Sequence, residues 1–251
     1  FVRGGKYKPS FADEEKEVCN LEVCKYPTTQ EMWLEIYKNN PSYHKGDKKP
    51  VEQVSWWKAI YFCNEMSKKC KLEPVYNITY DDFDNPILKI NQIGESPVEP
   101  DKADFKKTEG FRLPTEIEWE WFARGGQKAI DEGTFDYKYS GSNNIDEVAW
   151  YYENSGAKNE EGTTQNVGLK EANQLGLYDC SGNVWEWCYD ATKFIEDIKT
   201  VAYTFNFSTM YRILRGGSWN FADEICTTFY RGDFQAIDSD DYVGFRIVRT
   251  I

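Results

Sequence analysis

The sequence is short of histidine and of long apolar runs, and each shortage excludes a class of site. His44 is the only histidine among 251 residues, so a metal site built from three imidazoles is excluded. A Ser–His catalytic pair would have to use this same residue, which lies in the polar stretch 41–46 that favours a solvated turn. No run of about 18 apolar residues occurs, and the sequence therefore predicts no membrane-spanning helix.

Basic residues are also in the minority. The 30 Lys and Arg residues are outnumbered by 42 Asp and Glu, which gives a formal net charge of −12. A negative field repels phosphate backbones, so a nucleic-acid partner is not expected. The seven cysteines show no paired Cys-x-x-Cys spacing. Zinc binding and thioredoxin-type chemistry therefore find no support, and the odd number leaves at least one thiol without an intramolecular partner.

Aromatic side chains are abundant instead, with 9 Trp, 17 Tyr and 15 Phe. They provide a large buried area with few rotatable bonds, which allows a fold with many loops to stay ordered. The sequence has no internal repeat, no low-complexity linker and no shift in composition. We therefore predict that residues 1–251 form a single domain.

Three helices and several short strands are predicted. The helix starts are expected near residues 28–29, after the capping residue Ser55, and at the T-x-x-E capping box of Thr115 and Glu118, whose helix should stop at 125–126. The strand-like segments are 75–79, 87–90, 148–152, 184–188, 212–214 and 244–248. Helices come early and strands late, an order that indicates an α+β fold.

Four segments together resemble a known family. They are PVEQVSW at 50–56, GFRLPTEIEWE at 110–120, GLYD and GNVWEW between 176 and 187, and RGGSW at 215–219 with GFR at 244–246. In this order and spacing, from about residue 27 to the C-terminus, they resemble the sulfatase-modifying, formylglycine-generating enzyme family. The resemblance implies that family's C-type-lectin-like fold, with two to three helices around small twisted antiparallel sheets and much ordered loop.

Three arginines of these motifs lie among apolar and aromatic residues, namely Arg112, Arg215 and Arg246. A guanidinium in such surroundings needs carboxylates or carbonyls for its five donors. The candidate partners are Glu116, Glu118, Glu120 and Glu186. We interpret the motifs as buried ion pairs that join loops, so that they specify the fold and not the function.

The resemblance also supplies a test for catalysis. Formylglycine-generating enzymes oxidise a substrate cysteine with a pair of copper-binding cysteines between the GGS and GFR motifs. The first family position falls on Cys226, whereas the second falls on Arg231. One thiolate cannot make the two-sulfur site that selects a cuprous ion, and a guanidinium brings positive charge to the place of the cation. We therefore expect no copper, no required cofactor and no enzymatic activity; a formylglycine-generating-type oxidase or a degenerate relative of it is the alternative.

Between Trp219 and Gly244 the sequence changes character. Residues 220–242 show neither a helical nor a strand period, and they hold six acidic residues against one basic residue. Aromatic side chains stand beside Asp and Ser without an alternation that would bury them all, which is typical of binding loops on a rigid scaffold. We predict a surface for a partner of basic and apolar character; a family loop that has drifted is the alternative. The predicted ligand-binding residues are Phe221, Ala222, Asp223, Tyr230, Gly232, Asp233, Phe234, Ile237, Asp238, Asp240, Asp241 and Tyr242.

The place of this segment, directly before a C-terminal GFR, resembles the hypervariable region of variable proteins that retroelements diversify on the same fold. Their mutagenesis acts on adenines of AAC-type codons, which reach most residues at the predicted positions but neither Glu224 nor Gln235. The resemblance implies a receptor- or adhesin-like protein, secreted or displayed on the cell surface, often as a lipoprotein. Because the chain begins at Phe1 rather than at Met, we interpret it as a mature or trimmed product, with any export signal or lipid anchor in a segment outside this sequence.

The resemblance finally implies a structural calcium loop at 179–186. Side-chain oxygens of Asp179 and Glu186 would join the backbone carbonyls of Gly182 and Val184, and such hard oxygen ligands are what calcium prefers. The alternative is that Glu186 pairs with an arginine.

Overall fold

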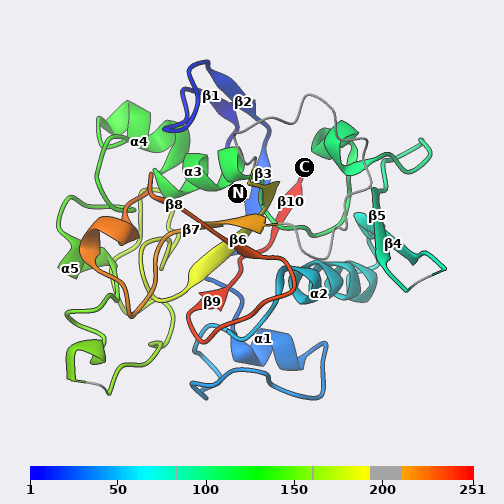
Figure 1. Cartoon of the computed structure of the whole chain (residues 1–251). Helices are drawn as coiled ribbons and strands as arrows, with labels where there is room; N and C mark the ends of the chain where they lie inside the picture. The colour runs from blue at the N-terminus through cyan, green and yellow to red at the C-terminus, as the bar shows by residue number, and fades with distance from the viewer. Residues whose placement is uncertain (83, 160, 193–210) are drawn as a thin grey trace, which may run out of the picture.

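The described part of the chain, residues 1–82, 84–159, 161–192 and 211–251 of a computed structural model, combines short helices with small sheets (Figure 1). The helices are α1 (Gln30–Leu34), α2 (Trp56–Lys69), α3 (Glu116–Ala123), α4 (Gly126–Glu132) and α5 (Ile145–Val148), with 3-10 helices η1 (Pro100–Lys102), η2 (Phe105–Lys107), η3 (Ala157–Asn159) and η5 (Asp223–Cys226). The strands are β1 (Gly5–Tyr7), β2 (Lys16–Val18), β3 (Leu21–Val23), β4 (Tyr76–Tyr80), β5 (Pro86–Ile90), β6 (Trp185–Ala191), β7 (Tyr211–Arg215), β8 (Arg231–Gln235), β9 (Val243–Gly244) and β10 (Val248–Thr250). This mixture confirms the α+β prediction.

The first three helices begin where the sequence provides capping side chains. Thr29 accepts a hydrogen bond from the Met32 N–H at the start of α1, and Ser55 caps α2 in the same way. The capping box of Thr115 and Glu118 starts α3, with both of its reciprocal hydrogen bonds formed. Because each cap satisfies an N–H that the helix itself cannot pair, these short polar signals locate the helix starts well.

Beyond α3, one helix was not predicted and one predicted strand was wrong. The helix does stop before Gly125, but this glycine adopts a φ of 87° and the chain enters α4 at once from Gly126. The segment 148–152 is not a strand, because the Asn144 side chain caps α5 just before it and Trp150 forms only an isolated β-bridge. In both places one residue decides the local structure, a glycine in the left-handed conformation or an asparagine side chain that caps a helix.

The main sheet has the strand order β8-β7-β6-β9. β7 pairs antiparallel with both β6 and β8, whereas β9 pairs parallel with β6. The remaining pairs are the antiparallel ladders β1–β2, β3–β10 and β4–β5. The predicted strand 244–248 is thus divided between two sheets, and β1 to β3 precede α1, so the prediction that helices come early and strands late was wrong.

The main sheet lies between α2 and α3 (Figure 1). On the side of α2, Trp56 and Phe62 pack with Trp187 of β6 in one buried cluster. On the side of α3, Trp119 packs with Ile213 of β7 in a second cluster. Among the described helices, none combines the length and the apolar character that crossing a lipid bilayer requires.

The three motif arginines are fully buried and paired with glutamates, as predicted. Arg112 donates through Nη1 and Nη2 to the Glu118 carboxylate at 2.6 and 2.8 Å. Arg215 pairs with Glu120 at 2.6 Å. Arg246 pairs with Glu186 at 2.7 Å. Each guanidinium is 0% exposed, so removing one partner would leave a buried charge uncompensated. These pairs hold α3, β6, β7 and the C-terminal segment in fixed relative positions.

Candidate functional site

Cys226 stands at the first position of the family's cysteine pair. It ends η5 and is fully buried in a small cluster with Tyr139 and Tyr151. Its Sγ lies 3.9 Å from the carbonyl oxygen of Ser218, and burial raises the pKa of the thiol to about 12. Reactive cysteines are accessible, low-pKa thiolates. Cys226 therefore has the environment of a core residue.

Arg231 stands at the second position of the pair. Its Nε and Nη2 donate to the two carboxylate oxygens of Glu116 at 2.6 and 2.8 Å, and its guanidinium lies 4.7 Å from the centre of the Phe11 ring. An arginine held by a carboxylate offers no ligand to a cation, so the residues at the two family positions do not fit a cuprous ion. Within the described residues, no group of three or more His, Cys, Asp and Glu side chains is arranged to hold a metal.

The loop predicted to bind calcium has its carboxylates occupied by N–H donors. Asp179 accepts from the backbone N–H of Gly168 at 2.8 Å and from Asn183 Nδ2 at 3.2 Å, and burial raises its pKa to about 6. Glu186 accepts from Arg246 at 2.7 Å and from a tryptophan Nε1 on α3. Because the guanidinium supplies the positive charge there, the Glu186 carboxylate is balanced without a cation, and we expect no structural calcium at this loop. The arrangement is the ion pair considered as the alternative.

The segment 220–242 is more regular than its sequence indicates. It contains η5 and the whole of β8, in which Gly232 lies opposite Leu214 and Phe234 opposite Arg212 of β7. The expectation of no strand period was therefore wrong over 231–235. The period is hidden because one of the two inward positions is a glycine, which has no apolar side chain to reveal it.

Aromatic side chains of the segment rest on two tryptophans of β6. Phe221 and Tyr230 contact Trp185 with ring centres 5.7 and 6.1 Å apart, and Phe234 stacks on Trp187 at 6.2 Å. A Cβ added at Gly232 would lie 3.1 Å from the Trp185 ring, so the strand runs directly over this side chain. These contacts fix the segment on the sheet.

Three large apolar side chains of the segment remain exposed to solvent. Phe229 is 47% exposed, Tyr230 40% and Ile237 50%; we refer to these three as the exposed apolar set. Phe229 was missed in the sequence, because its exposed ring lies outside any period that the sequence shows. Of the other predicted residues, Ala222 and Asp233 are exposed, and Phe221, Asp223, Gly232, Phe234, Asp238, Asp240, Asp241 and Tyr242 are partly buried.

The acidic residues of the segment divide into paired and available groups. Asp223 pairs with Lys138 at 3.4 Å, and Asp241 lies 3.5 Å from Nε2 of His44. Asp233 is exposed on β8 and accepts a neutral hydrogen bond from the Thr192 hydroxyl at 3.2 Å. The segment therefore retains negative charge beside the exposed apolar set.

His44 does not lie in a solvated turn, and that prediction was wrong. Its side chain is only 9% exposed and packs edge-on against Trp219 with ring centres 5.0 Å apart. The buried carboxylate of Glu52 accepts the backbone N–H groups of Tyr43 and His44 at 3.0 and 2.7 Å. Burial lowers the pKa of His44, although Asp241 opposes this effect. The loop around His44 thus supports the end of the segment.

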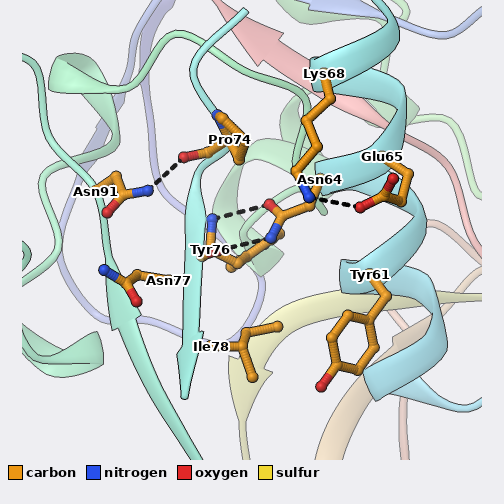
Figure 2. Close-up of a pocket in the computed structure, with 9 residues that line it drawn as sticks. All are labelled: Tyr61, Asn64, Glu65, Lys68, Pro74, Tyr76, Asn77, Ile78 and Asn91. Carbon is orange, nitrogen blue, oxygen red and sulfur yellow. Dashed lines mark hydrogen bonds and ion pairs between the residues drawn. The ribbon is translucent and has the colours of Figure 1, made fainter.

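A second surface feature, a pocket of about 360 Å³ between α2 and β4, has no residue of the segment in its lining (Figure 2). Its lining residues are Tyr61, Asn64, Glu65, Lys68, Pro74, Tyr76, Asn77, Ile78 and Asn91. Asn64 is bound at both ends to the backbone of Tyr76, at 2.6 and 3.1 Å, and Lys68 pairs with Glu65 at 2.7 Å. Most of the polar groups in Figure 2 therefore bind one another, and we do not assign this pocket a ligand.

The sequence and the structure of the chain are similar to those of several known proteins. Residues 1–251 match the family model of the sulfatase-modifying factor enzyme 1-like domain. The chain is 35% identical over 264 residues to the chaperone protein LppX of Paenibacillus barcinonensis, covering 99% of this chain and 88% of that protein. It is 36% identical over 166 residues to the formylglycine-generating enzyme of Mycobacterium tuberculosis, covering 59% of this chain and 54% of the enzyme, about half of its length. The solved structure of Treponema denticola variable protein 1 superimposes with a TM-score of 0.75 at 30% identity, covering 100% of this chain and 94% of that one.

Proposed function

Because this chain belongs to the family of sulfatase-modifying factor enzyme 1-like domains, we propose a function built on the family's scaffold rather than on its redox chemistry. The segment 220–242 presents a non-catalytic binding surface for a polypeptide partner of basic and apolar character. The partner binds through contacts alone and is not chemically changed.

The observation that carries this proposal is the exposed apolar set on a rigid base. Phe229, Tyr230 and Ile237 are each at least 40% exposed, while their neighbours Phe221 and Phe234 are fixed on Trp185 and Trp187. Large apolar side chains that are exposed on a rigid support are typical of interaction surfaces, because burying them on binding is favourable and little conformational entropy is lost.

The names of two similar proteins support the same proposal. One is named a variable protein and matches the whole chain in structure; another is named a chaperone, a class of protein that binds polypeptides, and matches 99% of the chain in sequence. We also propose a place on the cell surface or in the secreted fraction, with a lipid anchor as the means of attachment. The similarity to the chaperone supports a second candidate, in which the ligand is any unfolded chain rather than one specific partner.

Binding is tested with two unfolded polypeptides of opposite charge. Carboxamidomethylated lysozyme is basic and carboxamidomethylated α-lactalbumin is acidic, and we expect the protein to bind the first and not the second. The double variant F229S/I237S should lose most of this binding. The matched control I93S/L169S removes side chains that are 64% and 61% exposed elsewhere and should bind like the wild type. Equal binding by F229S/I237S and the wild type would refute the surface.

The oxidase alternative has a direct test of its own. Titration with a cuprous salt and incubation with a cysteine-containing sulfatase-type peptide should show neither stoichiometric copper uptake nor formylglycine. A product aldehyde would overturn the non-catalytic proposal. Suppression of aggregation of several unrelated unfolded proteins would favour the general chaperone over the specific receptor. A near-copy of the last codons in the source DNA, differing at adenines, would favour the receptor.

A further inference from the structure

β8 is the terminal strand of the main sheet. The strand order β8-β7-β6-β9 gives β8 one strand neighbour, β7, within the described part of the chain. In an antiparallel pair, alternate residues direct their N–H and C=O groups toward the partner, and the others direct them toward the opposite side. β8 therefore has backbone donors and acceptors along its outer edge, in the middle of the proposed binding segment. At the end of the strand the Gln235 C=O already accepts the N–H of Asp238 at 3.0 Å.

This edge has little of the protection that proteins usually give to edge strands, which are shielded by charges, proline or bulges. Gly232 has no side chain, and the Arg231 guanidinium is turned to Glu116 by two hydrogen bonds of 2.6 and 2.8 Å. Asp233 is the one exposed acidic residue of the strand. The edge of β8 consequently repels anions but does not exclude a neutral or basic strand.

Apolar side chains flank the edge at both ends. Phe229 and Tyr230 precede β8 and Ile237 follows it, with exposed fractions of 47%, 40% and 50%. The five residues of β8 span about 16 Å at about 3.3 Å per residue. A ligand strand of five or six residues would therefore reach from one apolar end to the other and pass Asp233 in between.

We propose that β8 is a docking edge, along which an extended segment of the partner adds as a further strand of the main sheet. Main-chain hydrogen bonds to β8 provide a sequence-independent part of the affinity. Apolar side chains of the ligand contact the exposed apolar set, and a basic side chain lies near Asp233. This recognition mode rests on the proposed function, since it uses the same surface and the same class of partner.

The charge of the segment selects the occupant. Residues 220–242 hold six acidic residues and one basic residue, and the basic one, Arg231, is already paired with Glu116. The negative charge of the segment does not attract an acidic or uncharged strand. A strand of alternating apolar and basic residues, by contrast, is complementary to the flanking apolar side chains and to the central carboxylate of Asp233.

The test uses the acetylated and amidated hexapeptide Val-Lys-Val-Lys-Val-Lys and an analogue that is N-methylated at its two central backbone nitrogens. The two methyl groups block both edges of the peptide strand and keep every side chain. Calorimetry should show binding of the first peptide and a loss of about tenfold or more in affinity for the second. A Val-Glu-Val-Glu-Val-Glu peptide should bind no better than the methylated one.

The protein variants locate the contact. D233K, which reverses the exposed charge on β8, should weaken the lysine peptide and strengthen the glutamate peptide, whereas the matched control D131K on α4 should do neither. Hydrogen exchange should show new protection at 231–235 in the presence of the lysine peptide.

The outcomes separate this inference from the proposed function. Equal affinity for the methylated and unmethylated peptides, with both lost in F229S/I237S, overturns the docking edge and leaves the binding surface standing. No binding of the lysine peptide by the wild type also overturns the docking edge. If F229S/I237S binds both the lysine peptide and lysozyme as the wild type does, the docking edge and the proposed function are both refuted.

Discussion

The substitution R231C restores the second cysteine of the family pair and tests whether one residue separates this chain from an oxidase. We expect it to restore neither copper binding nor oxidation. Cys226 is fully buried with Tyr139 and Tyr151, whereas the side chain at 231 points to Glu116 and Phe11. A thiol at position 231 would therefore have different neighbours from the Cys226 sulfur. A cuprous site needs both sulfurs bound to one cation.

R231C should lower the stability by a moderate amount. It removes a bidentate pair in which Glu116 is 4% exposed and Arg231 is 44% exposed. Loss of one partner of a fully buried pair costs about 3–5 kcal/mol, but solvent screens the half-exposed guanidinium. Glu116 also keeps Arg215, whose Nη1 lies 3.4 Å from its carboxylate. We therefore expect a loss of about 1–2 kcal/mol, which lowers the Tm of a chain of this size by about 2–8 °C.

The assay compares the wild type, R231C and R231K. Cuprous ion is titrated against a chromogenic chelator, the sulfatase-type peptide is analysed by mass for the aldehyde, and the Tm is measured by calorimetry. R231K retains the charge without the planar bidentate geometry and should fall between the other two in Tm. Stoichiometric copper binding by R231C that is lost in C226A/R231C would refute the reasoning, because it would show that the two sulfurs can meet.

Three further outcomes follow from particular contacts. G232L should lower the free energy of unfolding by about 1–3 kcal/mol, because its Cβ would lie 3.1 Å from the Trp185 ring. It should also weaken binding of the basic polypeptide. Unchanged denaturant midpoints would show that the Trp185 side chain moves aside without cost. Chelation at matched ionic strength should leave the Tm unchanged, since the carboxylates of Asp179 and Glu186 already accept N–H donors, and a rise in Tm on adding calcium would contradict this. Burial raises the pKa of Glu52 to about 7 from 4.5, so its protonated form is favoured by folding. The stability it provides is complete below about pH 4.5 and is lost as the pH rises through 7, by at most about 3 kcal/mol. E52Q should therefore lose less stability than the wild type between pH 5 and 8, as measured by guanidinium unfolding, and parallel losses would argue against Glu52 as the cause.

Local signals in the sequence were sufficient where one side chain decides the structure. Ser55 and the pair of Thr115 and Glu118 located two helix starts, and the buried motif arginines required partners that the sequence could name. The strands β1 to β3 were not predicted because each has three residues, too few to show an alternation. α4 depends on Gly125 in a left-handed conformation, which allows the chain to turn and resume a helix at once.

The candidate site could be located from the sequence but not resolved into supporting and contacting residues. Its limits followed from the motifs on either side. That Trp185 lies beneath Gly232, and that His44 packs on Trp219 at the end of the segment, depends on contacts between residues far apart in the chain, which no local pattern records. Phe229 was missed for the opposite reason, since an exposed aromatic outside any period resembles an ordinary loop residue.

Some residues of the segment contact the sheet and others face solvent, and this difference predicts which positions tolerate substitution. Phe221, Gly232 and Phe234 contact the tryptophans of β6, so changing them disturbs the sheet, whereas Ala222 and Ile237 are exposed and can change without loss of stability. If the surface serves different partners in different relatives, substitutions should concentrate at outward positions and spare the inward ones. Saturation mutagenesis, scored separately for folded yield and for binding of the basic polypeptide, should show tolerance of folding at 222 and 237 and intolerance at 232 and 234. Equal tolerance at all four positions would mean that the segment is held by something other than its contacts with the sheet.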